Sequence, residues 1–352
     1  MVLSLSQRAT MERVRSLGTG GHAVLLTPEI CTYLIGVIAN DLGVIQRFPE
    51  FKKKLTPFFT DTPLQNLRIG DIDYIAAYER LLNLDTNADT YFVCLAALHK
   101  GRLKYEHILR TQPMPTIEQV GPRALLQYGA LSSIGLASLL VWRKWIYDLD
   151  NRAAQETGYI FESIIANAIG GAPVPAARSP VRRVSDNEKG RQVDCILGAS
   201  AYEIKLRVTI AASGQGRWKE ELDFPADCKK SKFTPVLVVL DGTVNKKLTQ
   251  LAETYRTHGG EVYIGAAAWR HLEALAGATM AKFLKKYVRA PLNNLLGHNP
   301  KQLPPLSATL AGNTITLAVG DEHLIIERRP NPEAALDEDQ MPADVNDQLP
   351  DT

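Results

Sequence analysis

Residues 235–240 read PVLVVL, an unbroken aliphatic run with the length of one β-strand. A strand without polar alternation is buried on both faces, and its sheet therefore needs helices on both sides. The surrounding chain can supply such a sheet, because AYEIKLRVT at 201–209 alternates at period two, a helical pattern covers 245–258, and EVYIGAAAW at 261–269 contains another strand. We predict an α/β fold with a central mixed sheet flanked by helices.

The spacing of apolar residues and the charge composition divide the rest of the chain into further regions. Residues 1–148 carry apolar spacings of three and four, which predict a mainly helical region ahead of the α/β core at 149–295. Residues 296–329 alternate at period two around the turn pairs GN and GD, which predicts a small β-meander. Residues 330–352 hold seven of the 38 acidic residues and none of the 40 basic ones, so we expect a disordered acidic tail.

Charge and cysteine usage restrict the class of protein. Without the tail, residues 1–329 carry 40 basic against 31 acidic residues, a net charge of +9. The tail could serve solubility or compete with a polyanion for this basic body. The four cysteines are far apart in mostly apolar contexts, so we expect no disulfide framework or CxxC zinc site, and a reducing, cytoplasmic location. The apolar stretch 124–142 contains Gln127, three serines and two glycines, so we predict a buried helix rather than a membrane span.

Three charged residues occupy segments that otherwise resemble buried strands. Asp194 in VDCIL has apolar neighbours on both sides, where an ionised carboxylate is costly unless a cation or a donor compensates it. In AYEIKLRVT the even positions are apolar, whereas Glu203 and Lys205 share the odd positions, so one face packs and the other presents charge. Two carboxylates on paired strands would repel each other. A divalent cation resolves the conflict, and Mg²⁺ typically binds one or two protein carboxylates.

These residues resemble the PD-(D/E)xK nuclease superfamily and, within it, the type II restriction endonucleases. Asp194 matches the first acid of that pattern, and Glu203-Ile204-Lys205 matches its second element. Glu162 in GYIFESIIANAI stands where the family often has a helical acid, whereas Val193 replaces the family's proline. The resemblance covers roughly residues 150–270. The layout is also similar to that of the ApaLI-like enzymes, which implies the palindromic site GTGCAC.

The resemblance implies a restriction-endonuclease-like fold and a Mg²⁺-dependent hydrolysis of double-stranded DNA that leaves 5′-phosphate ends. Asp194 and Glu203, with the backbone carbonyl of Ile204, would hold the metal, and Lys205 would orient the attacking water. A palindromic site cut on both strands needs two active centres, and the chain carries one such set, so we expect a homodimer. A restriction enzyme also needs a cognate DNA methyltransferase as a genetic partner.

Several alternatives remain open at this point. The acids and the lysine could form a structural ion-pair ladder in a DNA-binding protein without catalysis, and the same core also serves repair, recombination and other defence nucleases. Two further acid-x-Lys patterns, at 50–52 and 227–229, lie beside prolines in polar contexts and are less suitable. For the helical acid, Glu162 has Ile165 and Ile169 on its helix face, and Glu156 is the competitor.

The segment RVTIAASGQGRWKEE, which follows the second element, supplies candidates for DNA recognition. Arginine suits guanine and glutamine suits adenine in bidentate contacts in the major groove, and small residues let a backbone approach DNA closely. A solvated helix start is the alternative. The DNA-binding candidates are Arg207, Ser213, Gln215, Arg217 and Lys219.

Overall fold

The computed structural model describes residues 3–17, 23–51, 55–60, 62–116, 118, 126, 132–206, 215–297 and 305–329. The N-terminal region is mainly helical, as expected. Its first three helices each begin at a side chain that accepts a backbone N–H bond, which satisfies donors that the helix itself leaves unpaired (Ser4, Thr27 and Asp73). The helices are α1 (Leu5–Arg15), α2 (Pro28–Asp41), α3 (Tyr74–Leu84) and α4 (Ala88–Thr111).

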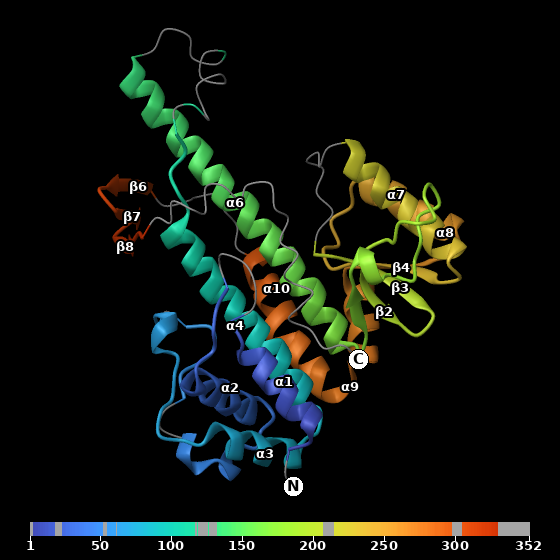
Figure 1. Ribbon diagram of the computed structural model, residues 1–352, viewed down its shortest axis with the longest axis horizontal. Coiled ribbons are helices and arrows are strands. Elements are labelled where there is room, and N and C mark those ends of the chain that lie inside the picture. The colour runs from blue at the N-terminus through green and yellow to red at the C-terminus, as the bar shows by residue number, and fades with distance from the viewer. Residues whose placement is uncertain are drawn as a thin grey trace.

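Helix α6 (Ser133–Ala168) is a single helix of 36 residues that runs from the N-terminal region to the sheet (Figure 1). It packs along α4 and then against the first strands of the sheet. Ile164 and Ile165 of this helix share one buried core with Leu95 of α4 and Tyr202 of the sheet. The helix continues through residues 148 and 149, where the change of sequence texture occurs. The helical region and the sheet are therefore built on a common core.

The central sheet has five strands in the order β1-β2-β3-β4-β5. β1 to β3 pair antiparallel, and β3, β4 and β5 pair parallel, so the sheet is mixed, as predicted. The strands are β1 (Ala172–Val174), β2 (Val193–Leu197), β3 (Ser200–Lys205), β4 (Thr234–Val239) and β5 (Glu261–Ile264).

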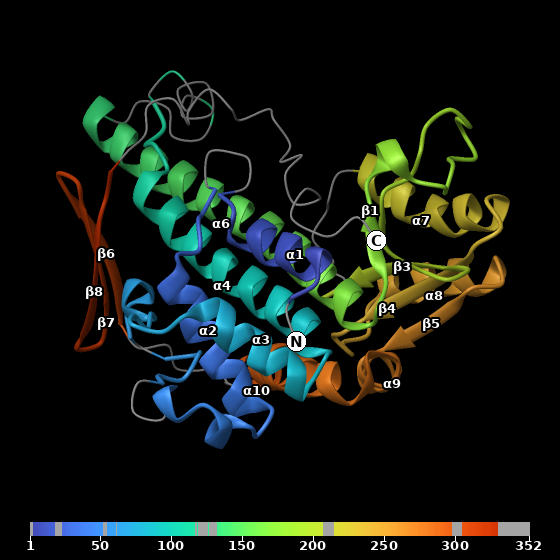
Figure 2. The same ribbon diagram turned by 60° about the horizontal axis from the view of Figure 1, so that its bottom comes forward.

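Helices cover both faces of this sheet (Figure 2). Helices α7 (Gln215–Lys230) and α8 (Lys246–Thr257) pack on one face, where Leu237 and Val239 of β4 join a buried cluster. Val236 and Val238 point to the other face and belong to the core that includes α6 and α9 (Ala266–Phe283). The burial of β4 on both faces confirms what its unbroken aliphatic run predicts.

The chain after α9 returns to the N-terminal helices. A π-helical turn η5 (Leu284–Arg289) leads into α10 (Ala290–Gly297). The Tyr287 hydroxyl donates to the Asp41 carboxylate of α2, which also accepts a hydrogen bond of 2.9 Å from the Tyr91 hydroxyl of α4. This segment therefore anchors the sheet to the helical region.

The predicted β-meander is present as β6 (Leu306–Ala311), β7 (Thr314–Val319) and β8 (Glu322–Glu327). Gly312 and Gly320 adopt positive φ angles of 58° and 59° in its two turns, which a glycine does without steric cost. Ile315 and Ile326 pack on Trp145 of α6. In Figure 2 the meander lies at the opposite end of α6 from the five-stranded sheet.

Other expectations concern the cysteines, the apolar stretch and the tail. All four cysteines are buried free thiols, as expected. Across the described ranges, no helix has both the length and the apolar character that a membrane crossing requires. The stretch 124–142 lies mostly outside the part of the chain whose side chains are described, and the tail 330–352 lies wholly outside it.

Candidate active site

The β2–β3 hairpin brings the two strand acids together. Its register pairs Cys195 with Tyr202 and Leu197 with Ser200, and one step further along this register Asp194 lies opposite Glu203. The Asp194 Oδ2 atom accepts a hydrogen bond of 2.8 Å from the backbone N–H of Ile204. A short antiparallel hairpin with one charged residue on each strand is therefore sufficient to place both carboxylates at one point.

Lys205 lies between two carboxylates that come from different elements. Its Nζ atom is 3.0 Å from Oε1 of Glu203 on β3 and 3.5 Å from Oε1 of Glu221 on α7. The three side chains are only 16%, 19% and 21% exposed for Lys205, Glu203 and Glu221. The charged face of β3 is thus largely covered by α7 rather than open to solvent.

The site carries more negative than positive charge. Burial raises the pKa of Asp194 well above its ordinary value, and the charges of Glu203 and Glu162 raise it further, while the Ile204 N–H and Lys205 offset part of the rise. Burial alone would lower the pKa of Lys205, but the charges of Glu203, Glu221 and Asp194 outweigh it and place that pKa above its usual range. The lysine is therefore a protonated donor, and the acids still lack a full counter-charge.

A cleft of about 750 Å³ opens beside this cluster. One wall is a stripe of mostly small residues on α6, among them Thr157 and Gly158, and Glu162 belongs to the same wall. The other walls are the end of β3, α7 and α8. The remaining lining residues are Tyr105, Asp150, Ala153, Ala154, Ile204, Lys205, Leu206, Trp218, Glu221 and Lys247.

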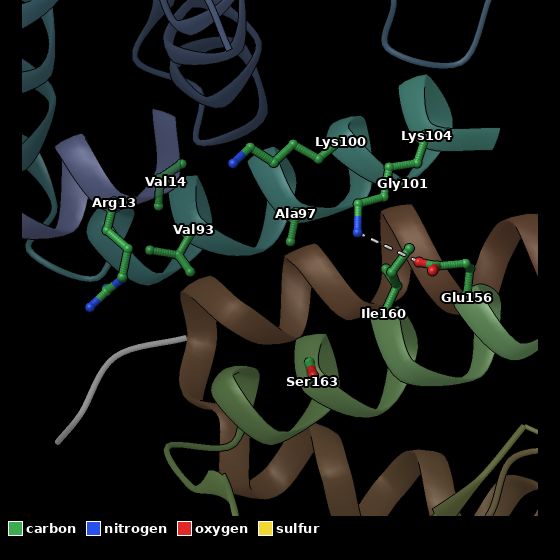
Figure 3. A pocket seen from close by; sticks show the side chains of 10 residues that line it. All are labelled: Arg13, Val14, Val93, Ala97, Lys100, Gly101, Lys104, Glu156, Ile160 and Ser163. Carbon is green, nitrogen blue, oxygen red and sulfur yellow. Dashed lines mark ion pairs between the residues drawn. The ribbon is translucent and has the colours of Figure 1, made fainter. Parts of the chain in front are cut away.

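The two candidate helical acids lie on different sides of α6. Glu162 faces the cleft and is near enough to Asp194 to raise its pKa. Glu156 instead pairs with Lys104 of α4 at 3.7 Å, beside a cavity of about 40 Å³ between α1, α4 and α6 (Figure 3). Of the two, only Glu162 is placed where it can act with Asp194 and Lys205.

The donor set suits a hard divalent cation that keeps most of its ligands as water. Among the residues that the structure describes, no group of three or more His, Cys, Asp or Glu side chains is close enough to hold a metal ion. Mg²⁺ commonly binds one or two carboxylates and completes its octahedron with water and phosphate oxygens. The paired acids Asp194 and Glu203, with their uncompensated charge, fit such an ion.

Most of the DNA-recognition candidates cannot be placed from side-chain positions. Arg207 and Ser213 lie outside the described residues, as do the side chains of Gln215 and Arg217 at the start of α7. Lys219 is exposed on α7 and does not line the cleft.

The structure adds three cleft residues that the sequence did not single out, namely Trp218, Glu221 and Lys247. The Lys247 ammonium lies 5.1 Å from the centre of the Trp218 ring. From Gln215 onward the chain forms helix α7, with Pro225 inside it. Glu221 has Trp218 and Pro225 at the spacings of one helix face, which is the signal that could have found it.

The acid-x-Lys pattern at 227–229 is explained by the same helix. Asp227 is 2% exposed and pairs with Arg191 at 3.3 Å, and it accepts a hydrogen bond of 2.6 Å from the backbone N–H of Val184. Asp227 is therefore buried, although the sequence around it is polar. Its role is to join the segment before β2 to α7.

Comparison with known proteins identifies the family. The model of the ApaLI-like restriction endonucleases matches residues 65–289, a range that includes the hairpin, the cleft and α7. The chain belongs to the ApaLI-like restriction endonuclease family. It is 42% identical to the type II restriction enzyme ApaLI of Acetobacter pasteurianus over 374 aligned residues, which cover 96% of this chain and 99% of that enzyme. No solved structure matches the chain. The expectation of a type II restriction endonuclease of this family is confirmed.

Proposed function

We propose that this restriction endonuclease hydrolyses double-stranded DNA in a Mg²⁺-dependent reaction centred on Asp194, Glu203 and Lys205. The observation that carries the proposal is the hairpin geometry, in which the Asp194 carboxylate binds the Ile204 N–H at 2.8 Å and Lys205 contacts Glu203 at 3.0 Å. The excess negative charge at the mouth of a cleft supports a cation site rather than a purely structural ion pair.

The proposed roles of the site residues follow from their charges. Asp194 and Glu203, with the carbonyl of Ile204, would hold Mg²⁺, which supplies polarisation of the scissile phosphate and a lowered pKa of water when it is bound. Lys205, held beside these ligands, would orient the attacking water and offset negative charge in the transition state. Glu162, on the opposite cleft wall, orients this cluster. The product carries a 5′-phosphate.

The test uses Asp194→Asn, because asparagine keeps an acceptor for the Ile204 N–H while it removes the charge. Purified protein is incubated with phage DNA and Mg²⁺, and the ends are sequenced and tested for a 5′-phosphate. We expect defined ends from the wild type and no cleavage by Asp194→Asn, whereas Asp223→Asn, an exposed acid on α7, should cleave normally. The sequences of the ends also show whether the enzyme recognises the site GTGCAC. Full cleavage by Asp194→Asn would refute the assignment.

The metal is tested with the same substrate. Mg²⁺ and Mn²⁺ should support cleavage, while Ca²⁺ should support DNA binding without turnover, because its longer and looser coordination misplaces the water. Binding measured by fluorescence anisotropy in Ca²⁺ separates the two steps. Cleavage that persists in excess EDTA would contradict a metal-dependent reaction.

We also infer that the enzyme acts as a homodimer and is encoded with a cognate DNA methyltransferase. Cutting both strands of a palindrome requires two active centres, and each chain supplies one hairpin set. Light scattering at micromolar concentration, with and without duplex DNA, tests the assembly. A monomer under both conditions would favour sequential nicking instead.

A further inference from the structure

Glu221 contacts the Lys205 ammonium from outside the β2–β3 hairpin. It projects from α7 and lines the cleft, and its Oε1 atom lies 3.5 Å from Lys205 Nζ. Glu203 lies on β3, two residues before Lys205, and its carboxylate contacts the ammonium at 3.0 Å. The ammonium is therefore held from two directions by groups on separate elements.

This second contact matters because a lysine side chain is hard to fix. Four methylene groups and three rotatable donors leave the Nζ atom free to move unless more than one partner holds it. Glu203 is also the proposed metal ligand, so its charge is shared with the cation when the site is loaded. Glu221 does not bind the metal in this arrangement and therefore remains an anionic partner of Lys205.

A role as a further metal ligand is less compatible with the geometry. Among the described residues, no three acidic, histidine or cysteine side chains converge at metal-binding distance. Glu221 reaches the site through its ion pair with Lys205.

We propose that Glu221 is a positioning residue that holds the Lys205 ammonium at the scissile phosphate through an ion pair from α7. The inference rests on the catalytic role proposed above for Lys205. Loss of this ion pair leaves the metal ligands in place but lets the ammonium leave its position. The chemical step should therefore slow down while DNA and metal binding remain.

The experiment compares Glu221→Ala, Glu221→Gln and Glu221→Asp in the full-length chain. Single-turnover cleavage is measured with saturating Mg²⁺, the dissociation constant for DNA is measured in Ca²⁺, and the Mg²⁺ concentration for half-maximal rate is determined. We expect Glu221→Ala to lower the rate constant by about 100-fold, the cost typical of a misplaced catalytic group. Glu221→Asp, which keeps the charge, should recover part of the rate, and Glu221→Gln should recover less.

The matched control is Glu220→Gln, the neighbouring glutamate on α7, whose carboxylate pairs with Arg183 at the surface and does not line the cleft. It should cleave like the wild type. Thermal unfolding of every variant checks the fold, and Glu221→Gln, which keeps the size of the side chain, provides the comparison if the alanine variant is unstable.

Three outcomes would overturn the proposal. Wild-type cleavage by both Glu221→Ala and Glu221→Gln would show that the contact has no role in catalysis. A loss of DNA affinity that matches the loss of rate would indicate a structural role, and a tenfold higher Mg²⁺ requirement would indicate a metal ligand. If Asp194→Asn also cleaves normally, the proposed function itself fails. If Asp194→Asn is inactive while the Glu221 variants are active, only the role of Glu221 fails.

Discussion

Replacing Lys205 by methionine should destabilise the metal-free protein as well as abolish cleavage. Methionine keeps the length and the apolar stem of the side chain but removes the cation between Glu203 and Glu221, which lie 3.0 Å and 3.5 Å from it. Removing one partner of a buried ion pair typically costs about 3–5 kcal/mol, because the remaining charge is left uncompensated. The two carboxylates keep about a fifth of their exposure to water, so we expect the lower end, about 3 kcal/mol.

Urea unfolding in EDTA at pH 7.5 measures this loss. The double variant Lys205→Met with Glu221→Gln should recover about half of it, because one of the two uncompensated carboxylates is gone. The control Lys219→Met changes an exposed lysine on α7 and should stay within about 0.5 kcal/mol of the wild type. If Lys205→Met unfolds within about 1 kcal/mol of the wild type, or if the double variant is no more stable than the single one, the two-sided ion pair does not hold the lysine.

His99 and the Arg191–Asp227 pair give two further predictions. His99 is fully buried, and burial, with a smaller contribution from Arg102, lowers its pKa to about 4 from 6.5. The folded state therefore binds this proton less readily than the unfolded chain, so stability is complete above pH 6.5 and about 3 kcal/mol is lost as the pH falls to 4. His99→Phe should lose less stability than the wild type between pH 7 and pH 4.5 in urea titrations, and an equal loss would contradict this origin. Asp227→Ala leaves Arg191 buried without its carboxylate partner and should cost about 3 kcal/mol, and adding Arg191→Met should restore part of this. No recovery in the double variant would show that the pair is not the cause.

The β2–β3 hairpin was predictable because its geometry is local. Period-two alternation and a short turn fix which residues of β2 and β3 face each other, so Asp194 and Glu203 could be placed together from their spacing alone. That Glu162 and Glu156 lie on different sides of α6 was predictable for a similar reason, since the helix period decides which acid shares a face with Ile165 and Ile169.

Glu221 was not predictable in the same way. Its contact with Lys205 depends on how α7 docks on the sheet, and no local pattern fixes the packing of a helix against a strand 16 positions earlier. Pro225 and the many charged residues of this segment also disguise a helix, because proline is unfavourable inside one. The change of sequence pattern near residue 149 does not mark the end of an element, because α6 runs through it and still contacts α4 at Glu156 and Ile164.

The continuity of α6 has a structural consequence. At a rise of about 1.5 Å per residue, its 36 residues form a rod of about 54 Å, with the meander attached near Trp145 and Glu162 near the other end. The α6 wall of the cleft therefore belongs to the same continuous helix that carries the meander. One run of backbone hydrogen bonds, packed in a core shared with α4 and the sheet, spans the distance between the two.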